Sequence, residues 1–224
     1  MSADGTRYAV GAPYHGRNGP AISESLPGLV RVFEWDGSNW NQLGADFDGQ
    51  ESEVLGWSVS LSSDGNRLAF GLPGGGTDGT GEVQVYEWNG ASWDQLGPGI
   101  EGEVAADFSG FSVSMSSDGN IIAVSSISND GANPNSNSGH VRLYQWSDVT
   151  SSWDQLGSDI DGQVDQAQFG FSISLSSDGT TVAVGAPQHD GINGDDSGHV
   201  TVFSLTCAPP SQEPSSQPTP FVVP

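Results

Sequence analysis

The chain has 224 residues, with 28 acidic side chains against five basic ones, and a formal net charge of -23. All five basic residues are arginines, so the sequence disfavours binding to nucleic acid or to an anionic membrane surface. No apolar run approaches the roughly 20 residues of a membrane-spanning helix, and the first residues lack the pattern of a signal peptide.

The composition indicates an all-β protein. Glycine occurs 32 times and is accompanied by seven Trp and nine Phe, which supply a core that a disordered chain would lack. Abundant turn residues with few helix formers are typical of many short strands. The single cysteine, Cys207, has no partner in the chain with which to form a disulfide.

The chain is a repeat. Asp-Gly pairs in one sequence context begin at Asp4, Asp64, Asp118 and Asp178, which are 60, 54 and 60 residues apart. A second block, built on VFEW or a close variant and followed by WDQLG or a close variant, recurs between them. A fixed period of this length indicates a repeat architecture in which each unit is one supersecondary structure.

Each unit is expected to form four strands in an antiparallel sheet. The first strands are predicted at 57–61, 111–115 and 171–175, and the second strands at 68–70, 122–124 and 182–184. The Ser-Ser-Asp-Gly segment between them is a hairpin signal. The third strand is predicted at residues such as 83–88, and the fourth at residues such as 93–96 after the Asn89-Gly90 turn.

The alternation of side chains favours propeller blades over a single sheet. Ser112 and Ser114 alternate with Phe111, Val113 and Met115, which suggests that both faces of the sheet are covered at close range. The fold class is therefore an all-β propeller of four-stranded antiparallel blades, at about 1–48, 55–101, 109–161 and 169–206.

The expected first blade lacks its first strand and the last blade lacks its fourth. Because the two incomplete blades lack different strands, they cannot complete one another. The pattern therefore favours part of a larger ring, or a fragment, over a small closed ring of four blades. Self-association through open blade faces is then expected. Residues 207–224 are rich in Pro and Ser and are expected to form a tail or stalk.

Short motifs in this repeat resemble the FG-GAP family, which builds the seven-bladed propeller of integrin α-subunits and related surface proteins. The Phe-Gly element matches Phe169-Gly170, and more loosely Leu55-Gly56 and 108–110, while Gly-Ala-Pro matches 11–13 and 185–187. The match is partial at 71–73 and absent at 125–127, and the resemblance covers about residues 2–205. It implies a non-enzymatic binding or adhesion module that is extracellular or at the cell surface.

In that family the turn after the first strand often binds calcium through a DxDxDGxxD pattern. Here serines such as Ser60 and Ser62 occupy the first ligand positions, and an apolar residue such as Leu68 occupies the last. No cofactor is therefore expected at these turns, and Asp64, Asp118 and Asp178 are predicted to shape hairpins instead.

Acidic residues concentrate in loops that a blade presents at one end. The loops between second and third strands, together with the connectors between blades, carry 16 of the 28 acids. Two interpretations stay open: recognition of a cationic or cation-bridged partner, and simple solvation, which charge alone favours. The candidate residues for a ligand or a divalent cation are Asp107, Asp130, Asp161, Asp165, Asp190, Asn193, Asp195 and Asp196.

The densest group of oxygen ligands is Asp190, Asn193, Asp195 and Asp196, which would suit Ca²⁺ if any site here does. Tryptophan pairs flank each turn between third and fourth strands, and are predicted to be cross-strand packing pairs. A repeated sugar-stacking platform is the alternative, and the residues concerned are Trp35, Trp40, Trp88, Trp93, Trp146 and Trp153.

No catalytic constellation appears, so an enzyme is not expected. His140 and His199 each follow Ser-Gly at the start of a third strand, where Leu29 and Glu82 stand in other units. They are predicted to be edge residues rather than ligands. The partner, whether protein or glycan, is not identified by the sequence.

Overall fold

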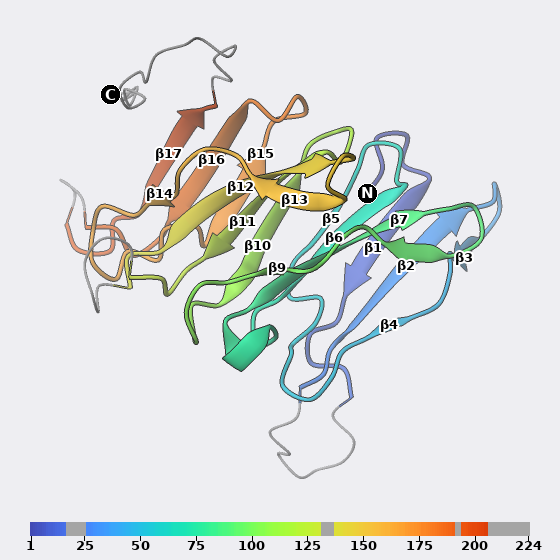
Figure 1. Cartoon of the computed structure of the whole chain (residues 1–224), viewed down its shortest axis with the longest axis horizontal. Coiled ribbons are helices and arrows are strands. Elements are labelled where there is room, and N and C mark those ends of the chain that lie inside the picture. Colours follow the sequence, from blue (N-terminus) through green and yellow to red (C-terminus); the bar gives the residue numbers. More distant parts are fainter. Residues whose placement is uncertain (17–25, 131–136, 191–193, 206–224) are drawn as a thin grey trace.

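The structure is a computed structural model that describes residues 1–16, 26–130, 137–190 and 194–205, which fold into four antiparallel sheets (Figure 1). The first sheet contains β1 (Arg7–Gly11), β2 (Leu29–Trp35), β3 (Trp40–Gln42) and β4 (Phe47–Asp48). The second contains β5 (Val59–Leu61), β6 (Arg67–Leu72), β7 (Glu82–Trp88), β8 (Trp93–Gln95) and β9 (Ile100–Glu101). A short 3₁₀ turn, η1 (Thr77–Gly79), lies between β6 and β7.

The third sheet contains β10 (Ser109–Met115), β11 (Ile121–Ser126), β12 (His140–Ser147), β13 (Ser152–Gln155) and β14 (Ile160–Asp161). The fourth contains β15 (Ser172–Leu175), β16 (Thr181–Ala186) and β17 (His199–Ser204). Among the described residues no helix is long and apolar enough to cross a membrane. The all-β, repeated-sheet prediction is confirmed.

In the first three sheets the outer strand differs from the sequence expectation because it is broken into two pieces. β7 pairs first with β8 and then, at its other end, with β9, and the same holds for β2 and β12. Gly97, with φ of 77°, follows β8 and takes the chain out of the ladder before it returns as β9. Asp48, Glu101 and Asp161, expected in connectors, therefore lie in short outer strands.

Successive sheets stack face to face. Between the second and third sheets, Val83 and Val85 pack against Val113, Ile122 and Val124 in one apolar cluster. Equivalent clusters join the first sheet to the second and the third to the fourth. Ala69 and Ala123 are fully buried, so the small residues do lie on a face that a neighbouring sheet covers.

Glycine at two motif positions lets neighbouring backbones touch. A Cβ added to Gly71 would lie 1.9 Å from the carbonyl oxygen of Gly110 in the next sheet, and Gly11 meets Gly56 in the same way. The glycine at the Phe-Gly position of one unit thus packs on the glycine of the Gly-x-Pro element before it, although Leu55 and Ser109 stand directly before Gly56 and Gly110. This contact explains why both motifs recur with the repeat.

The small serines of the first strands also make hydrogen bonds between sheets. Ser112 Oγ accepts from the backbone N–H of Ile173 at 3.2 Å, and Ser114 Oγ accepts from that of Leu175 at 2.9 Å. Ser60 Oγ likewise accepts from the N–H of Met115 at 3.1 Å. These serines therefore satisfy backbone donors of the next unit as well as permitting its close approach.

The described sheets form an open row. The sheet that begins with β1 lies at one end of the molecule and the sheet that ends with β17 lies at the other (Figure 1). The sheets follow one another in chain order, as blades of a propeller do, and the described residues do not close into a ring.

Candidate binding face

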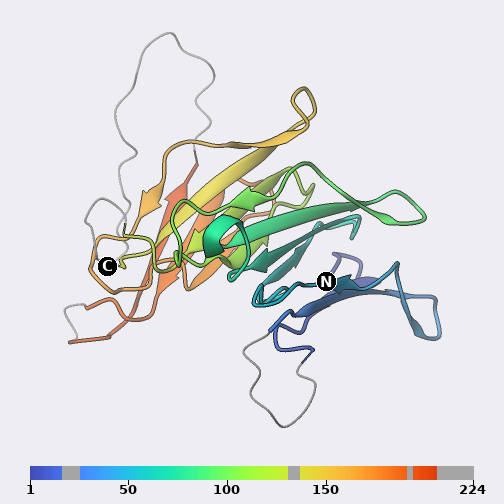
Figure 2. The same cartoon turned by 60° about the horizontal axis from the view of Figure 1, so that its bottom comes forward.

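One end of the stacked sheets carries the loops between second and third strands and the connectors between sheets. We call this end the acidic face; η1 belongs to it and is turned toward the viewer in Figure 2. The hairpins between first and second strands, with Asp64, Asp118 and Asp178, lie at the opposite end. Strand direction thus gathers acids from several units on one surface.

The described arginines are all engaged in ion pairs. On the acidic face Arg31 forms two hydrogen bonds with Asp46, at 2.9 and 2.6 Å, and the bond to Asp46 raises the pKa of Arg31. At the other end Arg7 pairs with Glu34 and Arg67 pairs with Glu87. On the acidic face Arg142 also pairs with Asp159 and Glu103. The other carboxylates of this face form no ion pair with a described arginine.

The predicted ligand residues fall into different environments. Asp107 is 5% exposed, and its carboxylate accepts from Asn129 Nδ2 at 2.8 Å and from the N–H of Val104 at 3.2 Å. It holds the connector in place rather than facing solvent. Asp165 is exposed, and Asp161 is half-buried in β14.

The cluster in the last loop is brought together in part. Asp190 Oδ1 accepts from the backbone N–H of Asp196 at 2.8 Å, and Asp195 is exposed beside them. Asn193 lies outside the described residues. In the preceding unit Asp130 Oδ1 accepts from the N–H of Asn137 at 3.1 Å. These carboxylates shape their own loops.

The tryptophan pairs pack across strands as predicted, with ring centroids 5.4 Å apart in each of three pairs. Trp93 Nε1 donates to Leu43 O, and Trp153 Nε1 donates to Leu96 O, both at 2.9 Å, so these rings reach the preceding sheet. Trp153 is buried, and Trp88 and Trp146 are half-buried. Trp35 and Trp40 of the first sheet are each 39% exposed.

The aspartates of the Asp-Gly hairpins are used by their own turns. Asp64 accepts from Ser62 Oγ at 2.6 Å and from the N–H of Asn66 at 3.0 Å, and Asp178 repeats this arrangement with Ser176 and Thr180. This geometry is that of a hydrogen-bonded hairpin.

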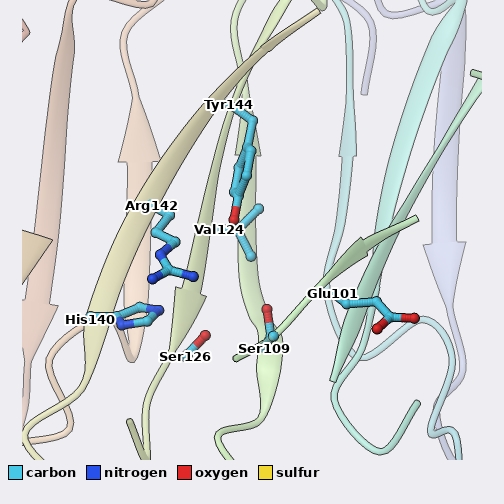
Figure 3. A pocket seen from close by; sticks show the side chains of 8 residues that line it. Glu101, Ser109, Val124, Ser126, His140, Arg142 and Tyr144 are labelled. Carbon is cyan, nitrogen blue, oxygen red and sulfur yellow. The ribbon is translucent and has the colours of Figure 1, made fainter. Parts of the chain in front are cut away.

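A polar cleft lies between the second and third sheets (Figure 3). Its lining residues are Glu101, Gly102, Ser109, Val124, Ser126, His140, Arg142 and Tyr144. His140 and Arg142, two residues apart on β12, project on the same side of the strand, as its period of two requires.

The pKa values of the two basic groups in this cleft shift in opposite directions. His140 is 2% exposed, and burial, assisted by the charge of Arg142, lowers its pKa. Burial also opposes the charge of Arg142, but hydrogen bonds to Asp159 and Glu103 outweigh burial and raise its pKa. Arg142 Nε and Nη2 bond to Asp159 at 2.8 and 2.5 Å, and Nη2 also pairs with Glu103.

Sequence reasoning missed this cleft. His140 was expected to be an edge residue, but it is buried in a cleft that Glu101 and Gly102 of the second unit also line, and Glu103 lies near it. One signal was available: Arg and Asp occur together at positions 31 and 46 and at 142 and 159, whereas the second unit has Gln84 and Gly99. Residues that change together between repeats indicate contact.

Comparison with known proteins agrees with the motif. The FG-GAP repeat profile matches residues 160–203. Residues 160–203 are therefore similar to an FG-GAP repeat. The matched segment runs from β14 to β17 and contains both the Phe169-Gly170 and the Gly185-Ala186-Pro187 elements. No curated protein matches the chain.

The four-sheet arrangement also occurs in a solved structure from Bacteroides uniformis, described as a proposed 6-phosphogluconolactonase. The two structures superpose with a TM-score of 0.54 at 12% sequence identity, over 81% of this chain and 46% of that one. The present chain spans a little under half the length of that protein. At this identity the likeness concerns the fold alone.

Proposed function

We propose that this FG-GAP-repeat chain is a non-enzymatic binding module that recognises a cationic protein partner through its acidic face, outside the cell or at its surface. The observation that carries the proposal is the distribution of charge. The described arginines are consumed in ion pairs, while Asp165, Asp190 and Asp195 are exposed on one face and form no ion pair with a described residue.

Rigid sheets that present loops at one end are a common platform for recognition. Carboxylates gathered on such a face raise the local concentration of a cationic partner and speed its association. Solvation also favours acids at a surface, but it would be served equally by either end of the molecule. The two explanations therefore differ in whether the effect of a carboxylate on binding depends on its position on the molecule.

A charge-matched pair of variants tests this difference. The triple variant Asp165→Asn, Asp190→Asn, Asp195→Asn removes three charges from the acidic face. Asp94→Asn, Asp148→Asn, Asp154→Asn removes three from the hairpins between third and fourth strands. Binding of an oligo-arginine peptide at physiological salt is expected to weaken about tenfold in the first variant and little in the second. Equal weakening of peptide binding in both variants would show that only the total charge matters, wherever the carboxylates lie, and would contradict the proposal.

A glycan ligand is the second candidate, and one observation favours it. Trp35 and Trp40 are both partly exposed and lie 5.4 Å apart, so one pair retains accessible ring surface. Quenching of tryptophan fluorescence by a glycan panel, lost in Trp40→Phe, would support this candidate. A spectrum that no glycan changes would remove it.

A further inference from the structure

The cleft between the second and third sheets brings together three metal-ligating side chains that come from separate segments. Glu103 follows β9, His140 begins β12, and Asp159 precedes β14. One ligand atom from each lies within 4.8 Å of the other two. The group therefore joins the connector after the second sheet to one strand of the third sheet and to the segment between β13 and β14.

His140 is the unusual member of this group. It is 2% exposed, and its Nδ1 is buried without a hydrogen-bond partner. Leaving such an atom unpaired in a protein interior is costly, and buried polar side chains nearly always find a partner. Figure 3 shows the ring projecting from β12 into the cleft, beside Arg142.

The Arg–Asp pair does not by itself explain the histidine. Arg31 and Asp46 form the same pair in the first sheet, where Leu29 occupies the position of His140. The imidazole of the third sheet and Glu103 of the preceding connector are thus additions to a pairing that is complete without them. An added ligand set, rather than the ion pair, is what requires explanation.

We propose that Glu103, His140 and Asp159 form a binding site for a divalent transition-metal ion, of which Zn²⁺ is the best match. One imidazole and two carboxylates are a donor set that Zn²⁺ accepts, and three protein ligands leave a position for water. The site is separate from the Asp-Gly hairpins and does not depend on the proposed partner. An ion here would tie two consecutive sheets together.

Arg142 competes with the ion in this arrangement, because its guanidinium holds both carboxylates. Two carboxylates and one guanidinium leave a net negative charge, and Glu101 in the cleft lining adds another. A dication is therefore electrostatically acceptable, but it must displace part of the guanidinium pairing. Arg142→Gln, which installs the residue found at position 84, should tighten metal binding.

Calorimetric titration of the full chain with Zn²⁺, repeated with Co²⁺ and an absorption spectrum, tests the site. We expect one site that weakens on the order of a hundredfold in His140→Gln and is unchanged in His199→Gln, the exposed equivalent in the last sheet. If His140→Gln fails to fold, Glu103→Gln gives the same test from the exposed side. Binding that is indifferent to both His140 and Glu103, spread over many weak sites, would overturn the proposal.

Discussion

At the scale of single residues, the carboxylates of this chain divide into those used by the fold and those left to solvent. Asp4 and Asp178 belong to the first group. The serine hydroxyls of Ser2 and Ser176, followed by backbone N–H groups, donate to the ionised carboxylates and lower each pKa to about 2. A net charge of -23 therefore overstates how many acids are available to a partner.

These shifts predict a pH dependence. A carboxyl whose pKa is lower in the folded state stabilises the protein above its unfolded pKa, and that contribution disappears as the pH falls through the folded value. The window is thus from pH 3.8 down to about 2. An NMR titration should find the Asp178 carboxyl below its usual midpoint, and Ser176→Ala should move the midpoint upward. An unchanged midpoint in that variant would contradict the assigned cause.

At the scale of elements, strands in which small and large side chains alternate can be predicted from the sequence. Structural features that depend on contact with another strand or unit cannot. The first, second and third strands of a unit were predicted within a few residues, since serine and alanine alternate with large apolar side chains. The break of the outer strand at Gly97 was not predicted, because β9 forms only by returning to β7. The burial of His140 was missed for the same reason: its cover comes from another unit.

The contact between glycines gives the sharpest test at this scale. Gly71→Ala should lower the free energy of unfolding by roughly 3 kcal/mol, because the new Cβ would meet the backbone of Gly110. Gly185 is the matched control, since the nearest atoms to its Cβ would all belong to Ser172 of its own sheet, with the side-chain Oγ closest at 2.6 Å. Urea denaturation should therefore show a much smaller loss for Gly185→Ala. Equal losses would mean that contact between sheets is not the cause.

At the scale of the whole molecule, each of the first three sheets packs one face against the sheet that follows it. The same face of the last sheet is exposed among the described residues. Val200 and Val202 are 67% and 51% exposed, whereas Val141 and Leu143, at the same positions of the third sheet, are 0% and 1% exposed. Three interfaces within the chain show what covers such a surface: another sheet of the same kind.

This exposure predicts self-association of the chain. Light scattering over a range of concentrations should find assemblies larger than the monomer, and Val200→Ser with Val202→Ser should shift the population toward monomer. The matched change Val149→Ser, at an exposed valine in the hairpin after β12, should have no effect. A wild-type chain that remains monomeric at all concentrations would contradict this expectation.

The central claim is that the acidic face is the recognition surface. Hydrogen–deuterium exchange of the full chain, with and without an oligo-arginine peptide, tests it most directly. We expect slower exchange in the connectors near 50–54, 103–108 and 163–168 and in the loop that ends at 194–198. Slower exchange confined to the hairpins between third and fourth strands, or spread evenly over the chain, would contradict it.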